Sequence, residues 1–318
     1  MIKIIRLALE EDIGAGDVTS RACVPEGLRA RGTFVAREPL VLAGTEVLDQ
    51  MFDHVVLLKH DGDRCAEGEL LATVEGNART LLERERVALN FLQRLSGVAT
   101  LARQFADAVA GTNCRVLDTR KTTPGLRALE KRAAAAGGVT NHRMGLFDAV
   151  LIKNNHIAAA GGIRQALLNA TQSPDHPSVP HPSQPDHPSV PQPSQPALPS
   201  VAANVGQAIL PASPLSSGLK PAGRPAGSIP IEIEVRTLAE LHEALDAGAQ
   251  HLLLDNLTPA EAAAWVREIA GRATVELSGG ITLETVRAYA ETGADFVSAG
   301  AITHSARAVD IGFRLVLA

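Results

Sequence analysis

Six short apolar segments in the second two-thirds of the chain most strongly constrain its fold. They are CRVLD (114–118), DAVLI (148–152), IEIEV (231–235), HLLLD (251–255), ATVELS (273–278) and ADFVSA (294–299). The last four recur at intervals of about 20 to 25 residues, separated by helix-like segments that open with the capping boxes Thr237–Glu240 and Thr258–Glu261. Strands that alternate with helices in this way predict an α/β fold with a parallel sheet or a βα barrel.

The first 110 residues follow a different pattern. Short segments with strand-like alternation come first, separated by Gly- and Asp-rich turns. Residues 78–110 then have the composition of a helix that Ser96 and Gly97 interrupt. We therefore expect a smaller N-terminal α/β domain over residues 1–110, packed beside a βα barrel over residues 111–318.

A proline-rich segment interrupts the βα pattern. Residues 172–228 hold 14 of the 19 prolines, and the unit PDHPSVPHPSQ (174–184) is followed directly by PDHPSVPQPSQ (185–195). Prolines at this density remove amide donors, and the few apolar residues cannot offset the entropy cost of ordering. We expect an extended or disordered insertion within one βα unit that catalysis does not need. A neutral repeat expansion and a proline-rich ligand for a partner both remain open.

The composition argues against several functional classes. The net charge of −5 and the pI of about 6.1 provide no basic field for a nucleic acid. Cys23, Cys65 and Cys114 are too few and too far apart for a disulfide framework or a cysteine metal site. The beginning of the chain turns acidic before a signal-length apolar run develops, and no run reaches about 18 apolar residues. We expect a cytoplasmic protein that binds neither nucleic acid nor membrane.

Polar residues end or follow each of the six apolar segments. They are Arg120 with Lys121, Lys153, Glu234, Asp255, Ser278 with Gly279 and Gly280, and Gly300 with His304. In βα barrels the carboxyl ends of the strands build the active site, so these residues are candidates for one shared site. The segment from Arg120 to Lys153 also holds seven Lys or Arg against two acids. Such a segment could be a solvated loop, but its start at a strand end favours a pocket for a small polyanion.

Five candidate residues supply positive charge, and they are Arg120, Lys121, His142, Arg143 and Lys153. The planar fork of arginine matches carboxylates and phosphates in a bidentate manner, whereas lysine acts as a point charge. Arg127 is either a further cation of the pocket or the first exposed charge of the helix that follows.

The remaining candidates complement these cations. Glu234 and Asp255 lie on consecutive predicted strands and could hold Mg²⁺ or ribose hydroxyls. Gly279, Gly280 and Gly300 leave backbone amides accessible before predicted helices, an arrangement that suits a phosphate. Together, the two sets predict a ligand that carries several carboxylates and phosphates, accompanied by a magnesium ion.

The segment DTRKTTPGLRALEKRAAAAGGVTNHRMGLFDAVLIKNNHI (118–157) resembles the signature of the quinolinate phosphoribosyltransferase family. LEEDIGAGDVTS (9–20) and ERVALNFLQRLSGVAT (85–100) are similar to its N-terminal motifs, and IEIEV, LLLDN, ELSGGI and SAGAITHSARAVDIG resemble its barrel motifs in the expected order. The likeness covers nearly the whole chain outside the proline-rich segment. Two positions depart from the family pattern. Val139 stands in place of a glycine, and Asn154 stands where an acidic residue is common.

The resemblance implies an activity and an architecture. Members of this family transfer the phosphoribosyl group of phosphoribosyl pyrophosphate to quinolinate with loss of CO₂, on the de novo route to NAD. The implied fold is an N-terminal α/β sandwich joined to an incomplete parallel βα barrel, with a C-terminal helix packing back on the first domain. The implied working unit is a homodimer that uses Mg²⁺ and no organic cofactor.

The matching positions also imply residue roles. The residues expected around the two quinolinate carboxylates are Arg120, His142, Arg143 and Lys153, with Arg86 supplied by the partner chain. Lys121 is expected to be a catalytic residue on the phosphoribosyl pyrophosphate side. Glu234 and Asp255 are expected to hold Mg²⁺ and ribose hydroxyls and to stabilise the cation-like ribose carbon. The residues expected at the 5-phosphate end are Ser278, Gly279, Gly280, Gly300 and His304.

Two other functions remain open at this stage. One is a related transferase of the same fold that acts on a different acid. The other is a non-catalytic phosphoribosyl-binding scaffold that uses the proline-rich segment to contact partners. The NHR segment (141–143) and the IKNNH segment (152–156) favour quinolinate, because they supply the cations that a dicarboxylate needs.

Overall fold

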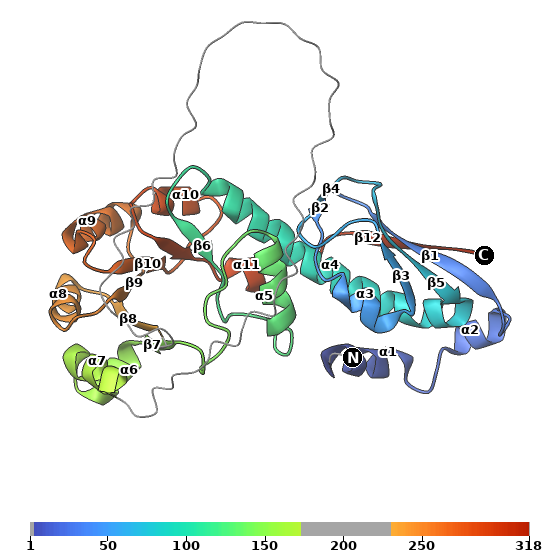
Figure 1. Ribbon diagram of the computed structural model, residues 1–318, viewed down its shortest axis with the longest axis horizontal. Helices are drawn as coiled ribbons and strands as arrows, with labels where there is room; N and C mark the ends of the chain where they lie inside the picture. The colour runs from blue at the N-terminus through green and yellow to red at the C-terminus, as the bar shows by residue number, and fades with distance from the viewer. Residues whose placement is uncertain (1–2, 173–229, 318) are drawn as a thin grey trace, which may run out of the picture.

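The computed structural model describes residues 3–172 and 230–317, which form two sheets at opposite ends of an elongated molecule (Figure 1). An antiparallel sheet lies at one end, and a parallel sheet of six strands lies at the other. The predicted α/β class, with an N-terminal sheet domain and a parallel βα layer, is confirmed. The predicted insertion (172–228) lies outside the described residues, apart from Gln172. The division of the chain at residue 110 stays a prediction.

The first sheet has the strand order β12-β1-β5-β3. Its strands are β1 (Arg29–Ala36), β3 (His54–Leu57), β5 (Leu70–Asn77) and β12 (Ile311–Leu317), and a small ribbon is formed by β2 (Leu40–Val41) and β4 (Arg64–Cys65). Its helices are α1 (Lys3–Ile13), α2 (Val18–Cys23), α3 (Glu46–Met51) and the first half of α4 (Ala78–Ala108). Alternate residues of β1 are buried, among them Ala30, Phe34 and Ala36, so one face of the sheet packs into the core.

The end of the chain corrects one expectation. The predicted C-terminal helix is instead the strand β12, which pairs antiparallel with β1 and places Phe34 opposite Phe313. The two rings are 5.0 Å apart, centre to centre. The segment IGFRLVL (311–317) alternates bulky apolar residues with a period of two, which fits a half-buried strand better than a helix. Strand β12, formed by the last described residues, therefore completes the sheet that begins with β1.

Helix α4 connects the two ends of the molecule. It has 31 residues, which corresponds to about 46 Å of helix. The predicted interruption at Ser96 and Gly97 is wrong, because α4 runs through both residues without a break. The Ser96 hydroxyl donates to the Ala43 carbonyl and accepts from the Ala43 amide. A Cβ atom at Gly97 would lie 2.0 Å from the Arg307 carbonyl oxygen. The two small residues thus allow close packing rather than ending the helix.

The parallel sheet has the strand order β6-β11-β10-β9-β8-β7. Its strands are β6 (Arg115–Leu117), β7 (Val150–Ile152), β8 (Ile231–Val235), β9 (His251–Asp255), β10 (Thr274–Ser278) and β11 (Phe296–Ser298). Strands β6 and β7 are the two edges of this sheet, so the described strands would form a closed six-stranded barrel only if these two paired. They do not pair, so the barrel is open between β6 and β7.

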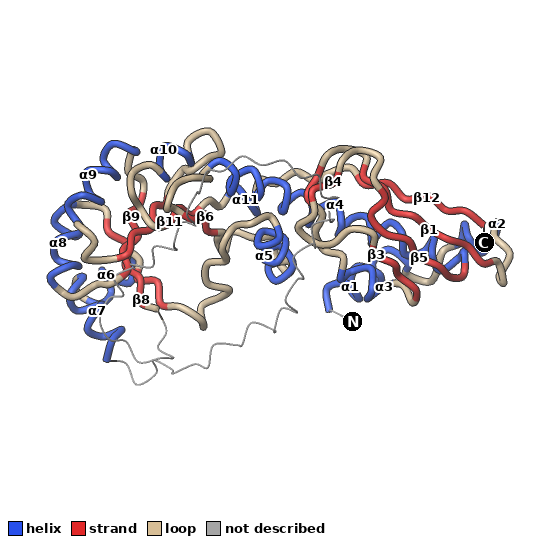
Figure 2. The backbone as a smooth tube through the Cα atoms, turned by 45° about the horizontal axis from the view of Figure 1, so that its top comes forward, coloured by secondary structure: helices blue, strands red, loops and turns tan. Residues whose placement is uncertain are grey.

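Helices cover the outside of this open barrel (Figure 2). They are α5 (Arg127–Ala136), α6 (Asn154–Ala160), α7 (Ile163–Gln172), α8 (Leu238–Asp246), α9 (Pro259–Ile269) and α10 (Val286–Ala290). The short helix α11 (Ala301–His304) packs instead against α4 and α5. The two capping boxes that the sequence predicted are present at the starts of α8 and α9. Across residues 3–172 and 230–317, every helix is too short or too polar to span a lipid bilayer.

Candidate active site

A cavity of about 780 Å³ opens at the carboxyl ends of the parallel strands. Eleven of the thirteen predicted site residues line it, and they are Arg120, Lys121, His142, Arg143, Lys153, Asp255, Ser278, Gly279, Gly280, Gly300 and His304. The other two lie elsewhere. Arg86 is exposed on α4, and Glu234 is buried near the end of β8, where it bonds the cavity residue Lys153. The strand ends therefore meet as the sequence predicted.

Arg120 and Arg143 give one side of the cavity a surplus of positive charge. The Nε atom of Arg120 is buried and has no hydrogen-bond partner among the described residues. Arg143 donates from its guanidinium to the Ala149 carbonyl at 3.2 Å. Burial and the nearby charge of Arg120 lower the pKa of Arg143. Two neighbouring guanidinium groups are unfavourable without an anion between them, so this wall is suited to a ligand with more than one carboxylate.

A buried ion pair fixes the two loops that carry these cations. Lys131 on α5 and Asp118 at the end of β6 are both completely buried and bonded to each other. Asp118 also accepts from the His142 backbone amide at 2.8 Å and from the Asn141 side chain at 2.6 Å, while Lys131 donates to the His142 carbonyl at 3.1 Å. Because a buried charge must be paired, this network holds the loop after β6 against the loop that carries His142.

Arg127 has a role that the sequence did not suggest. It is half-buried at the first position of α5 and is not among the residues that line the cavity. Its Nε atom donates to the Thr122 hydroxyl at 3.1 Å, and its guanidinium also donates to the Met144 carbonyl at 3.3 Å. Arg127 is therefore neither a cavity cation nor a free surface charge, but a bridge between the same two loops.

The backbone of Lys121 is held by a separate network. The Thr303 hydroxyl donates to the Lys121 carbonyl at 2.8 Å. Buried Glu130 accepts from the Thr123 amide at 2.9 Å and pairs with Arg94 of α4 at 2.8 Å. These contacts connect the loop after β6 with α4, α5 and α11, so Lys121 projects into the cavity from a rigid base.

Glycines after β10 and β11 allow close approaches within the cavity. Gly279 has a φ of 99°, and a Cβ atom there would lie 2.2 Å from the Asn256 side-chain oxygen. At Gly300 a Cβ atom would lie 2.8 Å from the Lys121 side chain and 3.1 Å from the His304 ring. Gly279 therefore requires glycine, and at both positions the backbone rather than a side chain faces the cavity. This wall fits the predicted phosphate end.

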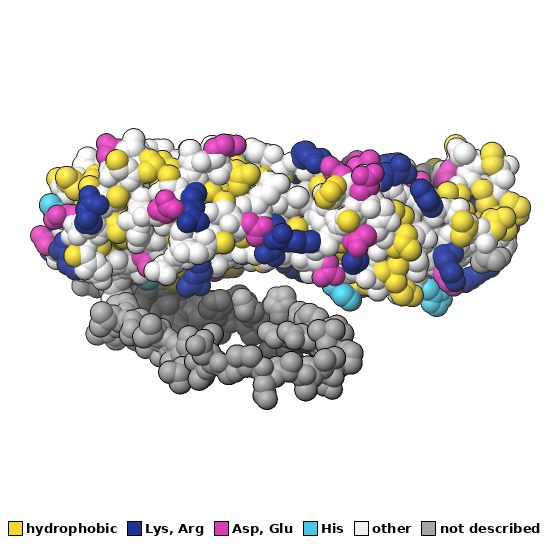
Figure 3. All heavy atoms as spheres, turned by 90° about the horizontal axis from the view of Figure 1, so that it is seen from above, with side chains coloured by type: hydrophobic (Ala, Val, Ile, Leu, Met, Phe, Trp, Pro, Cys, Tyr) yellow, Lys and Arg dark blue, Asp and Glu magenta, His cyan; other side chains and the backbone are white. Residues whose placement is uncertain are grey.

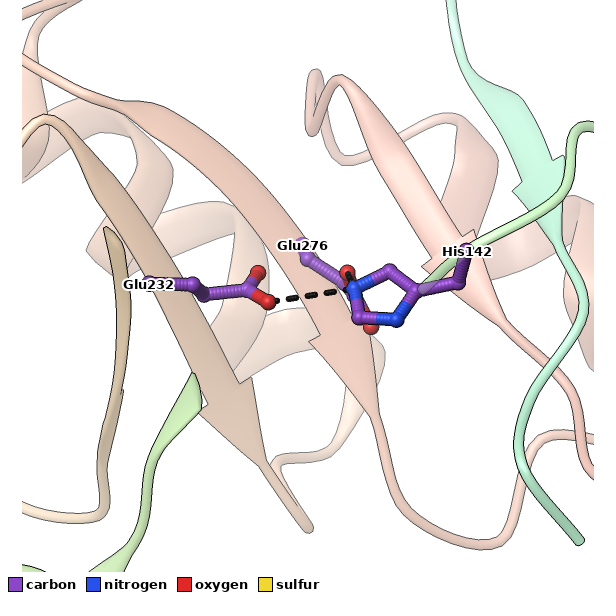
Figure 4. Close-up of side chains that lie close together, drawn as sticks. All are labelled: His142, Glu232 and Glu276. Atoms are coloured by element: carbon purple, nitrogen blue, oxygen red, sulfur yellow. Dashed lines mark hydrogen bonds and ion pairs between the residues drawn. The ribbon is translucent and has the colours of Figure 1, made fainter. Parts of the chain in front are cut away.

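His142 lies against two carboxylates that sequence reasoning missed, one partly buried and one buried (Figure 4). Its Nε2 atom is 3.2 Å from Glu232 of β8 and 3.3 Å from Glu276 of β10. Burial alone would lower the pKa of His142, but the hydrogen bonds and charges of Glu232 and Glu276 outweigh it and raise the pKa to about 10. The sequence contained one indication of Glu232. The segment IEIEV alternates with a period of two, which places Glu232 on the same strand face as the predicted site residue Glu234.

The pKa values of the two carboxylates shift in opposite directions. Burial raises the pKa of Glu232 to about 7, against the lowering effect of His142. Burial also acts to raise the pKa of Glu276, but the hydrogen bonds from His142 and Ser298 prevail and lower it. The cluster thus places the positively charged ring beside an ionised Glu276.

The two predicted metal ligands flank a position that a cation can occupy. Glu234 bonds Lys153 at 2.8 Å through one oxygen and Arg236 at 2.7 Å through the other. The same Arg236 guanidinium lies 3.6 Å from Asp255. Arg236 therefore stands between Glu234 and Asp255, where it shows that both carboxylates can reach a common positive charge. Sequence reasoning missed Arg236, because nothing in its spacing distinguishes it from a surface arginine.

The two departures from the family pattern do not disturb the cavity. Val139 is buried and is absent from the described residues with positive φ, so its position does not require glycine. Asn154 is exposed at the start of α6 and is not part of the cavity lining.

Comparison with known proteins gives a consistent result. The family model "Quinolinate phosphoribosyl transferase, N-terminal domain" matches residues 17–96, and the model "Quinolinate phosphoribosyl transferase, C-terminal domain" matches residues 98–179 and 216–314. A protein of Mycobacterium leprae named "Nicotinate-nucleotide pyrophosphorylase (carboxylating)" is 37% identical over 98% of this chain and 95% of its own length. A protein of Bacillus subtilis named "Probable nicotinate-nucleotide pyrophosphorylase (carboxylating)" is 34% identical over 99% of this chain and 93% of its own.

Solved structures of similarly named proteins have the same fold. The crystal structure of nicotinate-nucleotide pyrophosphorylase from Ehrlichia chaffeensis superimposes with a TM-score of 0.79 at 31% identity, covering 99% of this chain and 98% of that one. The structure of nicotinate-nucleotide pyrophosphorylase from Francisella tularensis gives a TM-score of 0.78 at 30% identity, covering 99% and 95% of the two chains.

Proposed function

Since this chain belongs to the quinolinate phosphoribosyltransferase family, we propose that it transfers the phosphoribosyl group of phosphoribosyl pyrophosphate to quinolinate. The ring nitrogen of quinolinate forms the new bond to the ribose carbon, and the bond to pyrophosphate breaks. Loss of CO₂ leaves an electron pair on the ring carbon, and uptake of one proton at this carbon gives nicotinate mononucleotide, a precursor of NAD. The observation that carries this proposal is the cavity wall with Arg120, Arg143, Lys153 and His142, whose charge fits a dicarboxylate.

The cavity residues divide the work of binding. Arg120, Arg143, His142 and Lys153 bind and orient the two carboxylates of quinolinate, while the glycine turn at Gly279–Gly280 receives the 5-phosphate. Orientation of the ring nitrogen toward the ribose carbon converts a bimolecular encounter into an intramolecular step. The carboxylate that leaves as CO₂ should occupy the least solvated part of the cavity, where loss of charge is favourable.

A divalent cation fits the pair Glu234 and Asp255. We propose that these residues hold Mg²⁺ together with the ribose hydroxyls, in place of the Arg236 contact that the structure shows. When bound, the ion neutralises charge on the departing pyrophosphate. Lys121 lies in the cavity wall beside Gly300 and is placed to stabilise the same charge.

A homodimer would complete the site. Arg86 is exposed on α4 and does not line its own cavity, so its expected contact with quinolinate requires a second copy of the chain. Hydrophobic side chains gather at the end of the molecule that carries the first sheet (right in Figure 3), and Val316 and Leu317 of β12 are 57% and 66% exposed. We propose that the partner's barrel covers this surface.

A reducing, cytoplasmic setting is consistent with the cysteines. Cys23, Cys65 and Cys114 are all free thiols, and the last two are buried. Burial raises the pKa of Cys114 to about 12, so this thiol is unreactive.

The activity is tested by incubating the purified protein with quinolinate, phosphoribosyl pyrophosphate and Mg²⁺, and by measuring pyrophosphate and CO₂. Arg143→Ala should weaken transition-state binding by roughly 2–4 kcal/mol, because the guanidinium group no longer binds a carboxylate of quinolinate. The measurement is the resulting fall in kcat/KM for quinolinate. Arg132→Ala is the matched control, since Arg132 is an exposed arginine of α5 that pairs with Glu46.

Three results would contradict the proposal. Pyrophosphate release with another acid but not with quinolinate would indicate a related transferase. No release with any acid would indicate a binding protein. A kcat/KM for Arg143→Ala equal to that of the control would remove Arg143 from the site.

A further inference from the structure

The environment of His142 differs from that of the other cavity cations. An arginine side chain is charged at any physiological pH, whereas a histidine with an ordinary pKa is mostly neutral above about pH 7. A neutral His142 that kept its proton on Nε2, facing Glu232 and Glu276, would present a lone pair from Nδ1. That lone pair would repel a carboxylate of the substrate, so the protonation state of His142 matters for binding.

The structure shows how this state is controlled. Both close contacts of the His142 ring use Nε2, at 3.2 Å from Glu232 and 3.3 Å from Glu276. Among the residues that the structure describes, none forms a hydrogen bond with Nδ1, and the ring lines the cavity. The side chains of Glu232 and Glu276 are only 13% and 5% exposed, so solvent screens the two contacts weakly.

We propose that Glu232 and Glu276 are positioning residues that hold His142 as an imidazolium, with Nε2–H directed at the two carboxylates and Nδ1–H directed into the cavity. This inference rests on the proposed function, because it assigns Nδ1–H to a quinolinate carboxylate. Glu276 is itself anchored by a hydrogen bond from Ser298 of β11. The cluster is thus built from three elements of the barrel (β8, β10 and β11) and one loop, which fixes the ring in a single orientation (Figure 4).

Other charged groups near His142 do not reverse this effect. Asp118 and Lys131 bind the backbone of His142 and neutralise each other. The cavity cations Arg120, Arg143 and Lys153 oppose a positive ring, but Lys153 is paired with Glu234. The direct carboxylate contacts therefore dominate, in agreement with the raised pKa of His142.

The protonation state is tested by ¹⁵N NMR of the histidine rings, with the His142 signal assigned by its loss in His142→Gln. In the wild-type protein His142 should remain doubly protonated up to at least about pH 8.5. Glu276→Gln should lower the titration midpoint of His142 by at least about one pH unit, because an anionic partner becomes neutral. Glu268→Gln is the matched control, since Glu268 forms the same kind of pair with His242 at 3.0 Å on the exposed surface.

The role in binding is tested by steady-state kinetics at pH 6 and pH 8.5. At pH 8.5 the KM for quinolinate should rise about tenfold in Glu276→Gln, with a smaller rise at pH 6, where His142 regains its proton. The KM for phosphoribosyl pyrophosphate should stay within about twofold of the control value. Glu232→Gln should shift both parameters in the same direction.

Specific results would overturn the inference. A wild-type His142 that titrates near pH 6.5 contradicts it even if neither glutamine variant folds. An unchanged midpoint in Glu276→Gln, or equal rises in both KM values at both pH values, would show that the carboxylates are merely structural. The NMR titration needs no turnover. An inactive wild-type protein would therefore contradict the proposed function, while the titration would still show whether His142 is protonated.

Discussion

At the scale of single residues, buried charges in this protein come in compensated groups. Asp118 pairs with Lys131, Glu130 pairs with Arg94, and Glu234 pairs with both Lys153 and Arg236. Each group lies beside the cavity and holds a backbone segment or a cation in place. Removal of either member of the Asp118–Lys131 pair would leave the other buried charge uncompensated, which costs about 3–5 kcal/mol in known cases. The catalytic end of the barrel therefore depends on pairs rather than on single residues.

Arg236 gives a prediction about metal binding. Its guanidinium occupies the position between Glu234 and Asp255, so it should compete with a divalent cation. Arg236 is about half exposed, and such ion pairs contribute about 0.5–1 kcal/mol. Arg236→Ala should therefore bind Mn²⁺ about two- to fivefold more tightly than the wild-type protein, as measured by calorimetry without substrates.

Two variants make this measurement specific. Arg6→Ala removes a somewhat more exposed arginine that pairs with Glu10 on α1, and it should leave Mn²⁺ binding unchanged. Arg236→Lys keeps the charge and should behave nearly like the wild-type protein. Weaker Mn²⁺ binding in Arg236→Ala would mean that Arg236 supports the metal site instead of competing for it.

At the scale of elements, α4 depends on small residues at its middle. Gly97 faces the backbone of Arg307 and Ala308 at a distance that leaves no space for a side chain. Gly97→Ala should therefore destabilise the protein by about 1–3 kcal/mol through overpacking, although alanine is the better helix former. The measurement is the denaturant midpoint, since a stability change shifts this midpoint at constant slope.

Gly27→Ala is the control for this substitution. A Cβ atom at Gly27 would meet nothing within 4 Å, and its φ is not in the left-handed region. This variant should change stability by less than about 0.5 kcal/mol. If Gly97→Ala proved as stable as Gly27→Ala, the close contact with Arg307 would not constrain α4.

The elements also show what the sequence could predict. IEIEV and HLLLD form strands with the predicted bounds, because their strand pattern and capping boxes are local properties. The predictions of a break in α4 and of a C-terminal helix were wrong, because both depend on contacts far away in the sequence. Gly97 packs against the Arg307 backbone, and β12 pairs with β1. The same distinction holds at the site. The sequence indicated which strand ends meet at the cavity, whereas Glu232, Glu276 and Arg236 were missed because their contacts join neighbouring strands, which one sequence does not reveal.

At the scale of the whole molecule, the proposed dimer makes a prediction about shared sites. Arg86 lies on α4 and does not line its own cavity, whereas Arg143 lines the cavity of its own chain. Arg86→Ala and Arg143→Ala should each be nearly inactive alone. When the two variants are refolded together, half of the dimers are mixed and each mixed dimer contains one intact site, so activity should return to about one quarter of the wild-type value.

The control is a mixture of Arg86→Ala with Arg86→Lys, in which no intact site can form. Recovery of activity in the first mixture and not in the second would support a site shared between chains. If the first mixture stays as inactive as its components, Arg86 does not serve the neighbouring cavity, and its place in the site is refuted.

The return of β12 to the first sheet has a consequence for the order of folding during synthesis. Strand β1 leaves the ribosome more than 270 residues before its partner β12. Until then, one edge of β1 carries unpaired amides and carbonyls that can pair with other nascent chains. The N-terminal sheet therefore cannot reach its final form as an independent first step. A ribosome that stalls within the barrel would release a chain with an open, association-prone edge.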